Sequence, residues 1–107
     1  MTGMTRRQQI EQMLAKEPAD QFLRYALAME LAKAQEHQAS QALFRGLMAD
    51  PTPHVPSFLM AAQQLLQQGE TEAARAVLRD GIETARRQGN LHAAGEMGEL
   101  LASAGAL

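Results

Sequence analysis

The sequence predicts an all-α fold of six helices. Two observations lead to this prediction, which are the amino-acid composition and the positions of proline and glycine along the chain. The strong helix formers Ala, Leu, Met, Gln and Glu make up 62 of the 107 residues, whereas the strand-favouring Val, Ile, Thr, Tyr, Phe and Trp make up 13. Proline and glycine divide the chain into segments of helical length. A chain of one domain's length with so few strand formers excludes all-β and parallel α/β folds.

The first three expected helices cover residues 5–16, 20–34 and 37–49. Thr5 with Gln8 three residues later has the pattern of a capping box, and Pro18 ends this helix. Asp20 is a suitable N-cap for the second helix. Pro51 stops the third helix, because proline cannot continue it.

The last three expected helices cover residues 55–69, 71–88 and 91–103. Pro56 is acceptable in the first turn of the fourth helix. Gly89 is a good left-handed stop for the fifth helix, and Asn90 is a good N-cap for the sixth. Gly95 and Gly98 weaken the sixth helix, which is expected to fray unless it docks. The connections are short, so neighbouring helices should form antiparallel hairpins.

Composition and charge exclude several classes of function. The net charge of −2 provides no basic excess, so no nucleic-acid partner is expected. Cysteine is absent, which excludes disulfides and thiolate chemistry. No apolar stretch approaches the length of a membrane span or a secretory signal, so no membrane partner is expected and a cytoplasmic location is the default.

The chain repeats itself with a period of 34 residues. Residues 21–54 and 55–88 are identical at six aligned pairs, which are Ala28 with Ala62, Leu31 with Leu65, Glu36 with Glu70, Ala39 with Ala73, Ala42 with Ala76, and Arg45 with Arg79. The apolar pairs fall on the faces where helices must touch. Stacked helical hairpins bury such faces against their neighbours.

This period over a helix–turn–helix resembles the tetratricopeptide repeat family. The residues that match the family's packing positions are Leu27, Ala28, Leu31, Phe44, Phe58, Ala61, Ala62, Leu65, Gly69, Ala74 and Leu78. Ser40 stands at the family's small position in the first unit. Arg24 replaces a large apolar residue there, and Gln35 stands where the second unit has its turn glycine. The alternative is an unrelated antiparallel helical bundle.

The resemblance implies a short right-handed α-solenoid in a single domain over residues 1–107. An N-terminal helix would occupy residues 1–17, the two repeats 20–54 and 55–88, and a capping helix 89–107. The family's concave groove, which holds peptide ligands, is lined by a second stripe on the first helix of each repeat. In this chain the expected groove residues are Phe22, Tyr25, Met29, Lys33, Leu59, Gln63, Leu66 and Gln67.

The expected function is therefore that of an adaptor that binds a protein or peptide partner, without catalysis or a cofactor. Lys33 is the one cation in the expected groove, so a clamp for acidic chain ends is not supported. An apolar or helical ligand, or a second copy of the chain, fits better. Two alternatives stay open: half of the groove residues pack against the terminal helices, or the chain is a self-associating homodimer.

Catalytic and metal-binding patterns are weak. His37, His54 and His92 lie in different segments without zinc-helix spacing, and exposed turn positions are expected for them. Gly95 and Gly98 lack the features of a phosphate loop and are expected to contact the fifth helix closely. On that helix, Glu83 is expected to pair with Arg79 and Arg86 on a solvated face.

Overall fold

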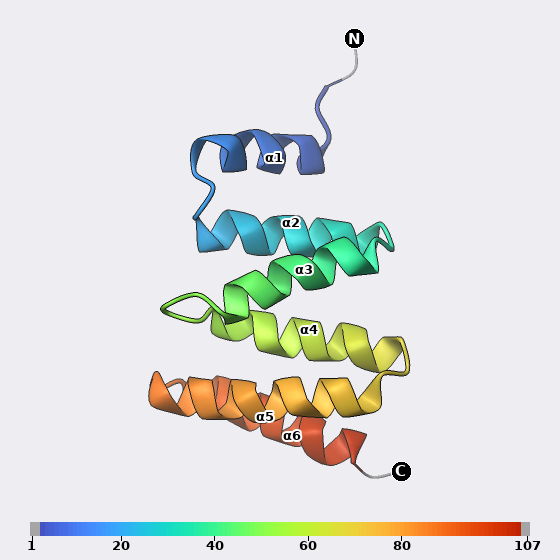
Figure 1. The fold of residues 1–107 in the computed structure, drawn as a ribbon, viewed down its shortest axis with the longest axis vertical. Helices are drawn as coiled ribbons and strands as arrows, with labels where there is room; N and C mark the ends of the chain where they lie inside the picture. Colours follow the sequence, from blue (N-terminus) through green and yellow to red (C-terminus); the bar gives the residue numbers. More distant parts are fainter. Residues whose placement is uncertain (1–2, 106–107) are drawn as a thin grey trace. The chain divides into compact units, whose positions relative to one another are not determined.

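The computed structural model describes residues 3–105. Within this range the chain forms six helices and no strand (Figure 1). They are α1 (Arg6–Lys16), α2 (Gln21–Lys33), α3 (His37–Met48), α4 (Val55–Gln67), α5 (Thr71–Arg87) and α6 (Leu91–Ala104). The predicted all-α class is confirmed, and each expected helix end is correct to within two residues.

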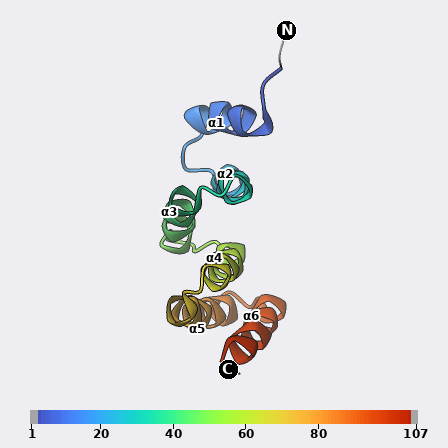
Figure 2. The ribbon, with the colours of Figure 1, turned by 90° about the vertical axis from the view of Figure 1, so that its right-hand side faces the viewer.

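The chain divides into two compact units, Met1–Ala49 with α1 to α3 and Asp50–Leu107 with α4 to α6. In the first unit α2 packs against both α1 and α3, and in the second α5 packs against both α4 and α6. Figure 2 shows α3 beside α2 and α6 beside α5. The division into repeats over residues 20–54 and 55–88 stays a prediction.

The helix starts are capped as the sequence predicts. The Gln8 amide donates to the Thr5 hydroxyl while the Gln8 side chain accepts from the Thr5 amide, which completes the capping box of α1. The amide of Leu23 donates to the Asp20 carboxylate at 2.8 Å. In the same way, the amide of Ala93 donates to the side-chain oxygen of Asn90 at 3.1 Å. Each cap satisfies a backbone donor that has no partner inside the helix.

Three helices end in the same left-handed turn. Gln35, Gly69 and Gly89 have φ angles of 64°, 78° and 76°, and each follows the C-cap of its helix. After α2, the amide of Gln35 donates to the Ala32 carbonyl and that of Glu36 to the Leu31 carbonyl, as in a Schellman motif. The same pair of hydrogen bonds follows α4 and α5. Glutamine thus adopts a backbone conformation that favours glycine.

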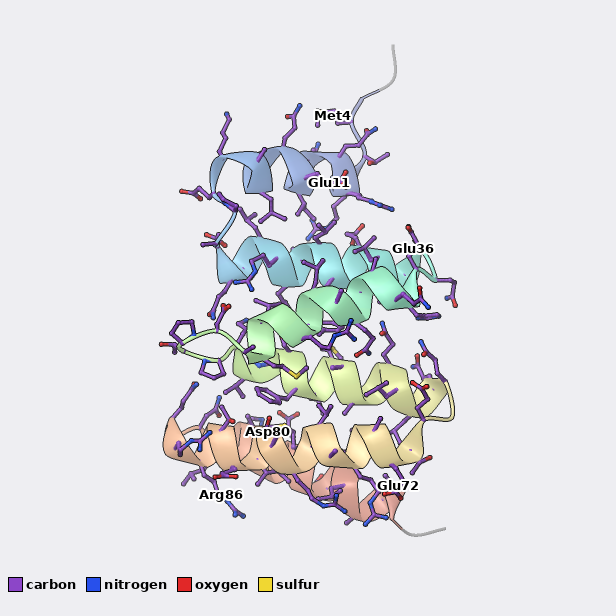
Figure 3. The ribbon with its side chains drawn as sticks, in the orientation of Figure 1. Met4, Glu11, Glu36, Glu72, Asp80 and Arg86 are labelled. Carbon is purple, nitrogen blue, oxygen red and sulfur yellow. The ribbon has the colours of Figure 1, made fainter. Side chains whose placement is uncertain are left out.

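The core of the first unit lies where α2 meets α3. Ala28, Leu31 and Phe44 are buried there. The Ser40 hydroxyl donates to the Ala28 carbonyl at 2.8 Å, so the small side chains at both positions let the two backbones approach closely. On α1, Ile10 is buried, while the side chain of Arg7 pairs with Glu36 in the turn after α2. Figure 3 labels Glu36.

The core of the second unit centres on Gly81 of α5. A Cβ atom added to Gly81 would lie 2.6 Å from the Met97 sulfur of α6 and 2.7 Å from the Phe58 Cβ of α4. Both neighbours are almost completely buried. The absence of a side chain at Gly81 therefore lets α4, α5 and α6 meet at one point.

The expected close contact through Gly95 and Gly98 is wrong. A Cβ atom at either position would meet nothing within 4 Å. The buried residues of α6 are Ala94 and Met97 instead, so this helix docks through a different face. That docking explains why α6 extends to Ala104 despite its two glycines.

Replacing Gln35 with glycine should stabilise the protein by about 1 kcal/mol, because glycine adopts a positive φ without the steric cost that glutamine carries. Urea unfolding followed by circular dichroism measures the change. The reciprocal variant Gly69→Gln is the matched control. Its Cβ would meet nothing within 4 Å, so backbone conformation alone should lower its stability by a similar amount. A loss of stability in Gln35→Gly would contradict this account.

Replacing Gly81 with alanine should lower the free energy of unfolding by about 2 kcal/mol, although alanine is the better helix former. The reason is the overlap of the new methyl group with Phe58 and Met97. Gly95→Ala is the control, because its methyl group enters open space and should raise stability by about 1 kcal/mol. Thermal unfolding compares the two, and equal effects would disprove the three-helix contact.

Candidate functional site

Four of the expected groove residues lie on α2 in the first unit. Tyr25 and Met29 are half-buried, whereas Phe22 and Lys33 are exposed. The ring centroid of Tyr25 lies 6.2 Å from that of Phe44 on α3, with the rings tilted by 55°. Partial burial raises the pKa of the Tyr25 hydroxyl above its ordinary value. Tyr25 thus contributes to packing as well as to the surface.

Phe22 is the most exposed large apolar side chain of the described residues, at 74%. Together with Met13 of α1, which is 47% exposed, it lines a hollow of about 560 Å³. The other residues around this α1–α2 hollow are Lys16, Glu17, Asp20 and Leu23. A large ring left in water beside a second apolar side chain marks a surface that can bury area against a partner.

Lys33, the one cation expected in the groove, is paired. Its ammonium group lies 3.2 Å from the Glu30 carboxylate, which is also 3.5 Å from the Arg6 guanidinium. The positive charge of Lys33 therefore has a neighbouring countercharge on its own helix, and a partner's carboxylate would have to compete with Glu30.

The other four expected groove residues lie on α4 in the second unit. Leu59, Gln63 and Leu66 are half-buried and Gln67 is exposed. Leu59 and Gln63 line a hollow of about 400 Å³ between α4 and α6. The remaining lining residues of this α4–α6 hollow all come from α6, and they are Glu96, Glu99, Leu100 and Ser103. Two of the predicted residues are thus brought together with four that the sequence did not indicate.

The resemblance to the repeat family predicts only a capping role for the last helix, so the four α6 residues are not among the expected site residues. Their spacing of three, four and seven residues from Glu96 places them on one face of α6. That spacing was a usable signal. Which helix this face meets could not be deduced, because the small residues Gly95 and Gly98 predict the close contact that Ala94 and Met97 make instead.

The expected repeat-packing residues are mostly in the interior. Nine of them are buried, and they are Ala28, Leu31, Phe44, Phe58, Ala61, Ala62, Leu65, Ala74 and Leu78. Leu27 is half-buried. Gly69 is exposed and supplies the left-handed turn after α4.

The histidines lie apart at helix starts. His37 is the first residue of α3, His54 is the N-cap of α4, and His92 lies in the first turn of α6. Nδ1 of His54 is 2.8 Å from the Ser57 hydroxyl. Within residues 3–105, no three side chains of the His, Asp and Glu types cluster in a way that could hold a metal ion. No helix of that range has the length and apolar character needed to cross a bilayer.

The expected ion pairs of Glu83 are wrong. Glu83 lies 3.3 Å from Arg87, four residues later, rather than pairing with Arg79 or Arg86. An ion pair on a helix is more favourable when the acidic residue lies four positions before the basic one. Glu83 and Arg87 have this order, whereas Arg79 and Glu83 have the reverse order. On the same helix Arg75 lies 3.9 Å from Glu72. Two arginines of α5 thus pair with acidic residues of their own helix.

Comparison with known proteins supports the fold through two solved structures. A tetratricopeptide repeat domain protein from Salinibacter ruber superposes with a TM-score of 0.78 and 31% sequence identity, over 84% of this chain and 91% of the other. A protein from Bordetella parapertussis superposes with a TM-score of 0.79 over 95% of this chain and 89% of the other, and its 23% identity supports the fold alone. No family model matches the chain, and no curated protein does.

The identity with the Salinibacter ruber protein extends over nearly all of that protein. This similarity to a repeat protein is consistent with the 34-residue period of the sequence and with the helical hairpins α2–α3 and α4–α5. The chain belongs to the tetratricopeptide repeat family.

Proposed function

We propose that this chain is a protein-interaction module, an adaptor that binds a segment of a partner protein. The observation that carries this proposal is the α4–α6 hollow, where Leu59 and Gln63 meet an additional helix face. Two of the four expected groove residues of α4 thus line a hollow that α6 does not cover completely. Apolar side chains with a few polar groups among them are the usual lining of ligand-binding clefts.

The chemistry of the hollow supports a partner side chain of moderate size. Leu59 and Leu100 supply the apolar contact, and Gln63 and Ser103 supply hydrogen-bonding groups. The volume of about 400 Å³ is within the range of small binding pockets. A leucine-sized side chain with its neighbouring backbone is the kind of ligand that these groups accommodate.

The first unit supports the same function with its own surface. Phe22 and Met13 expose apolar area beside the α1–α2 hollow. Aromatic and methionine side chains are favoured in interaction surfaces, because the ring provides a large contact and the thioether adapts to different partners. We assign Phe22, Tyr25, Met29 and Lys33 to this surface, and Leu59, Gln63, Leu66 and Gln67 to that of the second unit.

Site-specific photo-crosslinking in the native cell tests the proposal. Benzoylphenylalanine in place of Ser103, which is exposed and lines the α4–α6 hollow, should give an adduct heavier than the 11.7 kDa chain. The same group in place of Phe22 should also give an adduct, because this side chain is 74% exposed.

Ala102 is the matched control position, because it is exposed next to Ser103 but does not line the hollow. Equal adducts from positions 102 and 103 would contradict a specific site. An adduct with twice the mass of the chain, and no other, would favour the homodimer over the adaptor.

A further inference from the structure

We infer that the α4–α6 hollow selects a basic amphipathic helix of its partner, one that carries a leucine-class side chain flanked by arginine or lysine. This inference rests on the proposed function and specifies its ligand.

The hollow carries negative charge without a basic lining residue. Glu96 and Glu99 are its two charged members, and Leu59, Gln63, Leu100 and Ser103 are uncharged. The sequence of α4 contains no acidic or basic residue, so this helix does not neutralise the carboxylates. The basic residues of α6 are limited to His92, which lies 3.5 Å from Glu96 and is charged only when protonated. Among the described residues, Glu99 has no ion-pair partner.

The two carboxylates have a spacing that a helical ligand can match. Glu96 and Glu99 are three residues apart on α6, so they lie about 5–6 Å from each other on one face. Two cationic side chains one turn apart on a partner helix have the same separation. Leu100 lies next to Glu99 in sequence and lines the same hollow, so an apolar partner residue on the same helix face as the two cations would be directed toward it.

An acidic ligand is disfavoured for the same reasons. A partner carboxylate in the hollow would approach Glu96 and Glu99 with no lining cation to offset the repulsion. The charge complementarity is thus the reverse of a clamp for acidic chain ends, and it requires a basic partner.

Fluorescence anisotropy with three labelled peptides tests the inference on the full chain. The peptides are alanine-based helices with one leucine, and they differ only at the positions four and seven residues before it, which lie one turn apart on the face of the leucine. These two positions are occupied by arginine, glutamine or glutamate. We expect the arginine peptide to bind most tightly and the glutamate peptide most weakly. The affinity of the arginine peptide should fall as salt is added.

The double variant Glu96→Gln and Glu99→Gln should weaken binding of the arginine peptide about fivefold, as expected for the loss of two exposed ion pairs, and leave the glutamine peptide unaffected. The double variant Glu72→Gln and Glu83→Gln is the matched control. It removes the same net charge from exposed positions of α5 that do not line the hollow, and binding should be unchanged (Figure 3 labels Glu72).

Filling the hollow with Ser103→Trp separates this inference from the proposed function. If all three peptides bind equally and Ser103→Trp weakens them all, the hollow is a binding site and the preference for a basic helix is wrong. Failure of the arginine peptide to bind also overturns the inference, while crosslinking from Ser103 decides the proposed function on its own. Equal weakening by the α5 control variant would show a general charge effect and overturn the site.

Discussion

Close approach of helix backbones is the constraint on which this structure depends. The chain has one tyrosine, three phenylalanines and no tryptophan, so few aromatic side chains are present to fill gaps between distant helices. The helices instead meet through small residues that leave almost no exposed area, such as Ala28, Ala62 and Ala74. At Gly81 the backbone of α5 is so close to Phe58 and Met97 that even a methyl group has no room. The dense packing of the interior therefore depends on the small size of the side chains at these positions, and at Gly81 on the absence of one.

The same constraint leaves the hollow of the second unit open. Helices α4 and α6 both pack extensively against α5, but they contact each other far less. Phe58 and Met97 fill the junction beside Gly81, and beyond it the facing surfaces of α4 and α6 separate around Leu59 and Leu100. Because both helices are held by α5, they cannot close this gap without losing contacts at the junction. The hollow is thus a consequence of how the core is packed.

Charge gives the two units different surfaces. In the first unit Glu30 neutralises Lys33, and apolar exposure at Phe22 is the main feature available to a partner. In the second unit the arginines lie on α5, where Glu83 pairs with Arg87, while Glu96 and Glu99 of α6 line the hollow beside an uncharged α4. The hollow has a negative character because its two charged lining residues are glutamates and no basic side chain lines it.

The sequence by itself determined the helices, their caps and the packing face of each repeat, because these follow from interactions within a few residues, as at Thr5, Asp20 and Asn90. It also indicated Leu59 and Gln63, through the 34-residue period and the family it resembles. Only the tertiary structure decided that Gly81 is the point of close approach, that Gly95 and Gly98 face open space, and that Glu96 and Glu99 line the hollow with Leu59. Helical periodicity identifies the residues that share a face, but which face meets which neighbour depends on contacts between residues distant in sequence.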